Sequence, residues 1–152
     1  MSNDPLHPAN RLIIPGLGPI YGSLWEFAET LLRVVAGLAL VTHGFPKIMN
    51  PLGPVGVVEK VGLFPGPPEF WAVLLSCTEF FGGILIALGF LTRPAAFAAM
   101  IGLAVTIYFH WILMGEGYSG AEKSILWTTI MFYFVIRGAN AHSVDAKLGK
   151  TF

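Results

Sequence analysis

Two ionisable residues that could do chemistry interrupt stretches of sequence that are otherwise apolar. Arg33 and Glu79 each lie near the middle of such a stretch. If consecutive stretches run in opposite directions, these two residues fall at a similar depth, and we expect them to meet. An arginine at the centre of a bilayer costs about 2.5–3.5 kcal/mol on insertion scales, and a carboxylate partner offsets part of that cost. Such a pair could lock two helices in register, or it could bind a polar ligand head or relay protons. A third alternative is an uncharged Glu79, because burial disfavours a carboxylate.

A second polar group is predicted near one end of the same stretches. His43 lies about one turn from the end of the first stretch, His110 about one turn from the end of the third, and Glu122 near the start of the fourth. The two histidines could be axial ligands of a b-type haem, or they could coordinate a metal with Glu122. They could also hydrogen-bond the carbonyl of a quinone head, or be ordinary interfacial histidines. Because the sequence offers one such pair, haem is disfavoured, and we expect no metal site.

The composition indicates whether these residues lie in a soluble protein or in a membrane. Of the 152 residues, 55% are hydrophobic and 12% are charged, against roughly 25% charged in soluble domains. Nine basic residues balance nine acidic ones, which excludes a nucleic-acid binder that relies on a basic patch. A single cysteine, Cys77, excludes an internal disulfide, a CxxC pair and a thiolate metal cage. The composition indicates an integral membrane protein.

Four apolar stretches are long enough to be membrane-spanning helices, which need about 20 residues. Backbone polar groups must be paired internally in lipid, so these stretches should be helical. The eleven prolines lie outside the predicted helix interiors. We therefore predict an all-α integral membrane four-helix bundle over residues 24–138, between an N-terminal tail (1–23) and a C-terminal tail (139–152). The predicted helices cover residues 24–45, 69–92, 95–115 and 121–138.

A Pro/Gly-rich connection, residues 46–68, joins the first two predicted helices. Val55, Val58 and Val61 recur three residues apart, with Glu59 and Lys60 on other faces. This pattern is compatible with a short amphipathic helix at the membrane interface. An irregular loop is an equally good interpretation.

Basic residues outside the predicted helices indicate the orientation, because cytoplasmic loops carry an excess of lysine and arginine. Five lie on the face that holds both termini and three on the other face. We expect a multi-pass protein with both termini in the cytoplasm.

Several motifs together resemble the DoxX family of small bacterial membrane proteins. The stretch LLRVVAGLALVTHGFPKIMNP resembles that family's first helix, and Glu79–Gly83 with Gly89–Arg93 resemble its second helix and turn. His110, Glu122 and the tail from Gly138 to Asp145 continue the match, which covers roughly residues 28–148. The positions that match are Arg33, His43, Lys47, Glu79, Arg93, His110 and Glu122.

The resemblance implies a four-helix protein of the bacterial inner (cytoplasmic) membrane with both termini cytoplasmic. Namesakes of the family are associated with thiosulfate:quinone oxidoreductase, which passes electrons into the quinone pool as part of a complex, and other members are linked to redox homeostasis. The chain is also similar in outline to four-helix quinone-linked thiol oxidoreductases, but its lone Cys77 makes dithiol exchange implausible. No catalytic residue is transferred from the family.

Three hypotheses about function follow. The first is a quinone-linked accessory subunit of a membrane oxidoreductase, in which Arg33 and Glu79 form the polar base of a cleft. His43 and His110 would contact the quinone head, and Lys47, Arg93 and Glu122 would support the site. The chain has no evident redox cofactor, so a partner protein would supply electrons. The alternative is a non-catalytic structural or assembly subunit of a larger membrane complex. The third is a small cytochrome or a solute carrier, and four short helices without paired broken segments match known carriers poorly.

Overall fold

The computed structural model describes residues 12–150, and this part of the chain contains helices and no strand. The predicted all-α fold class is confirmed. A short 3-10 turn, η2 (Pro15–Leu17), leads into the helices. The elements in chain order are α1 (Gly18–Met49), α2 (Val55–Val61), α3 (Pro68–Cys77), η3 (Thr78–Gly82), α4 (Gly83–Leu88), α5 (Thr92–Tyr108), η4 (Phe109–Leu113), α6 (Gly117–Arg137) and α7 (Val144–Lys147).

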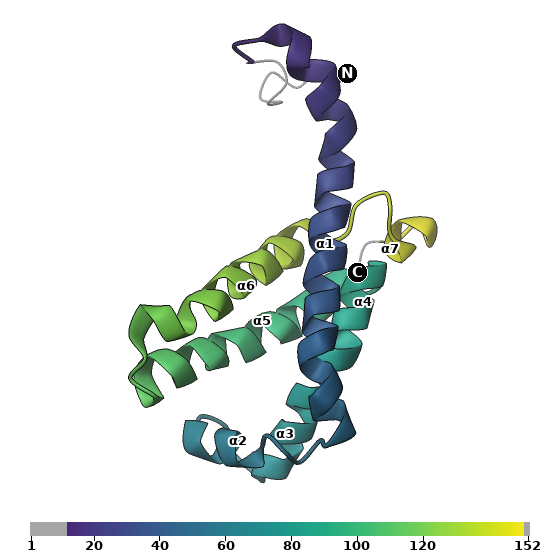
Figure 1. Cartoon of the computed structure of the whole chain (residues 1–152). Coiled ribbons are helices and arrows are strands. Elements are labelled where there is room, and N and C mark those ends of the chain that lie inside the picture. Colours follow the sequence, from purple (N-terminus) through teal and green to yellow (C-terminus); the bar gives the residue numbers. More distant parts are fainter. Residues whose placement is uncertain (1–11, 151–152) are drawn as a thin grey trace.

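The long helices form two antiparallel hairpins (Figure 1). In the first hairpin α1 packs along α4 and η3, which continue α3 as one rod, and in the second α5 packs along α6. The hairpins meet at the turn between α4 and α5, and α5 and α6 then run away from α1 to one side. The short helix α2 lies beside α3 at the far end of the first hairpin.

Small residues allow the first hairpin to pack closely. A Cβ added at Gly37 would lie 2.5 Å from the backbone nitrogen of Ala87 and 2.6 Å from the carbonyl oxygen of Gly83. A Cβ at Gly44 would overlap the backbone nitrogen of Phe80. Close approach through glycine and alanine is typical of helices packed within lipid. These contacts fix the register of α1 against α4 and η3.

Two helical segments are long and apolar enough to cross a membrane, Pro68–Leu88 and Thr92–Leu113, each with a mean hydropathy of 1.9. Most of their residues lie outside the packed interior. Large apolar side chains such as Phe70, Phe97 and Ile101 are therefore exposed on the surface of the chain. A membrane supplies the apolar surroundings that these side chains require.

The first helix is longer than the sequence predicts. It begins at Gly18 and ends at Met49, so it passes through Pro46, and the prediction that no proline lies inside a helix is wrong here. Pro46 is tolerated because it lies in the last turn, where its missing N–H removes one hydrogen bond close to the end of the ladder. In the connection that follows α1, residues 55–61 form the helix α2. The interpretation of these residues as a short helix is therefore correct, and that of an irregular loop is not.

The glycine contacts predict a large effect of the smallest possible substitution. Gly37→Ala should lower the stability of the protein by about 1–3 kcal/mol, because its Cβ meets rigid backbone of the facing helix. Thermal unfolding of the purified protein in detergent measures the change. Gly22→Ala is the control, because Gly22 lies on the same helix with no atom of another residue near its added Cβ, and it should stabilise slightly through helix propensity. Equal unfolding temperatures for the two variants would contradict the packing argument.

Candidate functional site

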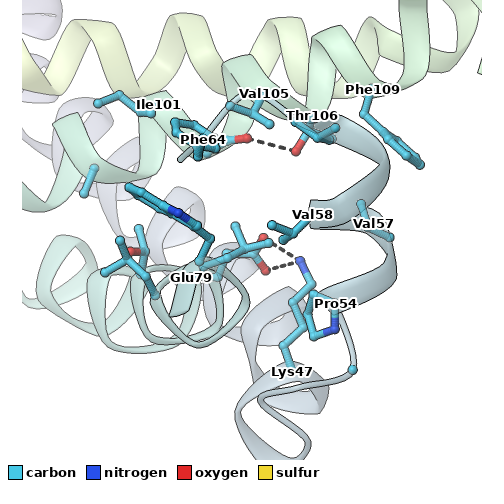
Figure 2. A pocket seen from close by; sticks show the side chains of 18 of the residues that line it. Lys47, Pro54, Val57, Val58, Phe64, Glu79, Ile101, Val105, Thr106 and Phe109 are labelled. Atoms are coloured by element: carbon cyan, nitrogen blue, oxygen red, sulfur yellow. Dashed lines mark hydrogen bonds and ion pairs between the residues drawn. The ribbon is translucent and has the colours of Figure 1, made fainter. Parts of the chain in front are cut away.

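A pocket of about 530 Å³ lies between the two hairpins and is covered by α2 (Figure 2). Its walls come from the end of α1, from α2, from α3 and η3, from the part of α5 nearer η4, and from η4. Most of the lining is apolar, and valines of α2 and α5 lie on opposite sides of it. The divergence of the hairpins opens this space. The connection between α1 and α3 passes across it.

An ion pair lies within this largely apolar pocket. Lys47 Nζ is 2.5 Å from both carboxylate oxygens of Glu79, as Figure 2 shows. The two side chains are 33% and 15% exposed. Glu79 lies in the π-helical segment η3, against which α1 packs through Gly44. Single π-helical turns within α-helices frequently occur at functional sites.

Aromatic side chains form another part of the wall. The rings of Phe64 and Trp71 are stacked with centroids 4.6 Å apart, and the indole N–H of Trp71 donates to the carbonyl of Pro65 at 2.9 Å. At the other rim, Lys60 Nζ lies 5.8 Å from the centroid of the Phe109 ring, which holds α2 beside η4. The pocket therefore has a fixed flat surface that suits a planar ring.

His110 also lines the pocket and lies in a second π-helical segment, η4. Its Nδ1 is 2.7 Å from Oε2 of Glu116, and the backbone N–H of Glu116 donates to the carbonyl of His110 at 3.1 Å. A carboxylate on one ring nitrogen fixes the orientation of the imidazole. The pocket thus combines an ammonium, a carboxylate and an oriented imidazole with an apolar interior, the usual form of a small-molecule site.

The structure does not bring Arg33 to Glu79, so the expected pair between them is wrong. Arg33 is 1% exposed and donates from Nη1 to the carbonyls of Ile86 and Ala87, at 2.9 and 2.7 Å, and from Nη2 to that of His142 at 2.8 Å. The prediction that Arg33 and Glu79 lie at the same depth failed because α1 extends past the end of α4. The middle of α1 therefore faces the end of α4, and Lys47 takes the place opposite Glu79.

The C-terminal segment completes this buried cluster at the turn between α4 and α5. Asp145, almost fully buried, accepts from the backbone N–H groups of Leu91 and Thr92 and from the Thr92 hydroxyl, at 2.9, 3.2 and 3.0 Å. Leu91 has φ of +49°, and among the residues with a described backbone it is the one non-glycine residue with positive φ. Gly89 must be glycine because a Cβ would lie 2.5 Å from both Arg33 and Ser143.

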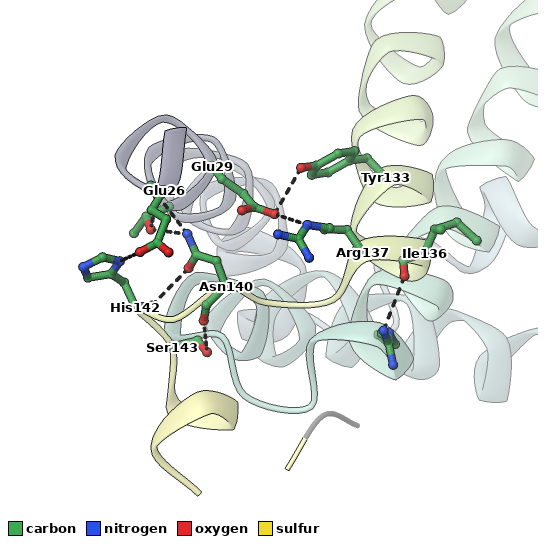
Figure 3. A network of polar contacts seen from close by, with 10 residues as sticks. Glu26, Glu29, Tyr133, Ile136, Arg137, Asn140, His142 and Ser143 are labelled. Atoms are coloured by element: carbon green, nitrogen blue, oxygen red, sulfur yellow. Dashed lines mark hydrogen bonds and ion pairs between the residues drawn. The ribbon is translucent and has the colours of Figure 1, made fainter. Parts of the chain in front are cut away.

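A neighbouring network ties α6 and the chain after it to α1 (Figure 3). Glu29 Oε1 is 3.2 Å from Arg137 Nε and accepts from the hydroxyl of Tyr133 at 3.1 Å. The side-chain amide of Asn140 donates to the carbonyl of Glu26 and to the hydroxyl of Thr30 at 2.8 and 2.7 Å. These bonds fix the polar end of the second hairpin to the first.

The remaining predicted site residues lie apart from one another. His43 is exposed on α1 and is not part of the pocket lining, because the next residue, Gly44, is the one that faces η3. Glu122 is exposed on α6, and Glu116 takes the position beside His110. Arg93 lies on the first turn of α5 near Ile136. The structure therefore does not bring His43, His110 and Glu122 together. Within residues 12–150, no three His, Cys, Asp or Glu side chains are arranged to hold a metal ion.

Sequence reasoning missed several residues of these clusters. Trp71 forms part of the pocket wall, although no motif in the sequence singles it out. Asn140, Ser143 and Asp145 were placed in a tail, although all three are buried. Ser143, two residues before Asp145, caps α7, because its side chain accepts from the N–H of Ala146. A serine at this position is a sequence signal for the start of a short helix.

These features define a class of protein: a small all-α membrane protein with a ligand-sized pocket between two helical hairpins. The DoxX family matches residues 28–111. The chain is 31% identical over 121 residues to the inner membrane protein YqjF of Escherichia coli K12, which covers 78% of this chain and 89% of the relative. It is 29% identical over 136 residues to the E. coli inner membrane protein YphA, covering 84% and 94%. It is also 30% identical over 126 residues to an uncharacterised protein of Haemophilus influenzae, covering 78% and 89%.

The chain belongs to the DoxX family, as its sequence predicted. Its relatives support a location in the bacterial inner membrane. No solved structure matches the chain.

The buried carboxylate at the turn gives a second prediction. Asp145→Asn should destabilise the protein by about 1–3 kcal/mol, because the amide replaces one acceptor oxygen by a donor that faces backbone N–H groups. Glu122→Gln removes the same charge from an exposed position and should change stability by less than about 0.5 kcal/mol. Thermal unfolding in detergent compares the two variants. A loss no larger for Asp145→Asn than for the control would refute the role of this residue.

Proposed function

We propose that this protein is a quinone-linked accessory component of a membrane oxidoreductase complex, and that the pocket between its hairpins binds the quinone head. The observation that carries the proposal is the Lys47–Glu79 pair set in an apolar pocket of about 530 Å³. A quinone has a flat ring with polar oxygens and an apolar tail, and it partitions into the membrane that this protein occupies.

The lining residues suit such a head group chemically. The stacked rings of Phe64 and Trp71 offer a flat apolar surface to a ring. The ammonium of Lys47 can donate its third N–H to a ring oxygen while two remain on Glu79. Because Glu79 neutralises that ammonium, the pocket favours an uncharged polar head over an anion.

His110 supplies a second polar group of the right kind. Glu116 holds its Nδ1 side, so the opposite ring nitrogen is available to hydrogen-bond or exchange a proton with a bound ring oxygen. When bound, the quinone would accept electrons delivered by a partner protein. The residues of this chain would orient the ring and hold protons at Lys47 and His110.

The orientation in the membrane is part of this proposal. Both termini lie in the cytoplasm, as the distribution of lysine and arginine indicates. The pocket then lies toward the opposite, outer face, because α2 is at the far end of the first hairpin from the C-terminal segment.

Binding of a short-tailed quinone to the purified full chain in detergent tests the proposal. We expect saturable binding, and Lys47→Met should weaken it at least about tenfold, since hydrogen bonds to charged groups contribute about 1.5–3 kcal/mol. Lys123→Met, at an exposed site on α6 outside the pocket, is the control and should leave the affinity unchanged. Absence of saturable binding, or equal affinity of both variants, would refute quinone binding in this pocket.

A non-catalytic structural or assembly subunit is the second candidate. It is favoured by the geometry of the ion pair. The ammonium of Lys47 contacts both carboxylate oxygens of Glu79 and so joins α1 to η3. Replacing both partners, Lys47→Met with Glu79→Leu, separates the candidates. For a structural subunit the double variant retains assembly and host-membrane quinone reduction, whereas a quinone site would lose that reduction with assembly intact.

A further inference from the structure

A second hollow lies at the opposite end of α5 from His110. It is a groove of about 590 Å³ between the first turn of α5 and the last turns of α6. Two arginines line it, Arg93 from α5 and Arg137 from α6, together with Thr129, Phe132, Tyr133 and Ile136. The function proposed above does not use this groove.

The charges in the groove leave one unit of positive charge uncompensated. Arg137 is paired with Glu29, Nε to Oε1 at 3.2 Å. Within residues 12–150, no carboxylate lies within salt-bridge distance of Arg93, whose Nη2 donates to the carbonyl of Ile136 at 3.5 Å. The guanidinium of Arg93 therefore retains most of its donors for another partner.

Apolar side chains border the two arginines. Phe132 and Ile136 are 55% and 64% exposed, and both lie on the face of α6 that lines the groove. The apolar sequence SILWTTIMFYFVI precedes Arg137, and Arg93 lies on the first turn of α5. Both arginines therefore lie at the end of an apolar helix. In a membrane this is the level at which hydrocarbon gives way to head groups.

We propose that this groove binds the phosphate group of an anionic phospholipid, with an acyl chain along Phe132 and Ile136. The planar guanidinium group forms paired hydrogen bonds to phosphate oxygens. One uncompensated positive charge matches the single negative charge of a phosphodiester. The apolar border distinguishes a lipid from free phosphate, because an inorganic ion leaves Phe132 and Ile136 uncovered. Basic pockets between transmembrane helices are known to bind lipid head groups.

The proposal is independent of quinone binding. The groove shares no lining residue with the pocket that contains Lys47. A failure of one site therefore leaves the other intact, and each is measured with its own ligand.

Native mass spectrometry of the full chain in detergent, titrated with phosphatidylglycerol, tests the site. We expect tighter binding of phosphatidylglycerol than of phosphatidylcholine with the same acyl chains, and no displacement by glycerol 3-phosphate at the same concentration. Arg93→Gln should weaken phosphatidylglycerol binding about fivefold, from about 1 kcal/mol per basic residue near a lipid surface. Lys123→Gln removes the same charge from the other end of α6 and should have no effect.

A second variant tests the groove with Arg93 in place, so the test does not depend on whether Arg93→Gln folds. Thr129→Glu adds a carboxylate at an exposed position inside the groove and should also lower phosphatidylglycerol affinity. Equal binding of the two lipids, or unchanged phosphatidylglycerol affinity in both groove variants, would overturn the proposal. Effective competition by glycerol 3-phosphate would assign the groove to a soluble phosphate ester instead.

Discussion

The arrangement of the two hairpins depends on how the reversal between α4 and α5 satisfies its backbone groups. A helix that ends leaves carbonyls without partners, and a helix that begins leaves N–H groups without partners. Here Arg33 donates to two carbonyls at the end of α4, and Asp145 accepts from two N–H groups at the start of α5. The guanidinium and the carboxylate also match the charges at the two helix ends. A cation and an anion from distant parts of the chain thus stabilise one turn.

This fixed turn explains how the pocket can exist. Because Arg33, Asp145 and the Glu29–Arg137 pair join the hairpins at one end, the helices do not have to pack along their whole length. The hairpins diverge toward the other end, and α2 covers the space between them. The polar residues are accordingly divided. Those at the turn bond mainly to backbone and hold the fold, whereas Lys47, Glu79 and His110 line a hollow.

The sequence predicts the class of this fold because long apolar stretches leave the backbone little choice but a helix. It does not predict which residues meet. The register of α1 depends on the contacts of Gly37 and Gly44 with the facing helix, and the overhang of α1 beyond α4 displaces Arg33 from the depth of Glu79. The role of Asp145 was missed for a related reason. The capping Ser143 indicates a short helix, but nothing local in the sequence indicates that Asp145 will bond to a turn more than fifty residues earlier.

Stability alone does not account for the ion pair in the pocket. Replacing a buried ion pair by well-packed apolar residues is often neutral or stabilising, because desolvation of two charges offsets their attraction. The α1–η3 contact already has close packing at Gly44, which requires no charge. The pair also lies beside a hollow rather than within a filled core, and His110, which is paired with Glu116, borders the same hollow from the other hairpin. Polar groups that converge on a space from separate elements are what recognition of a ligand requires, and this convergence favours binding over a purely structural role for the pocket.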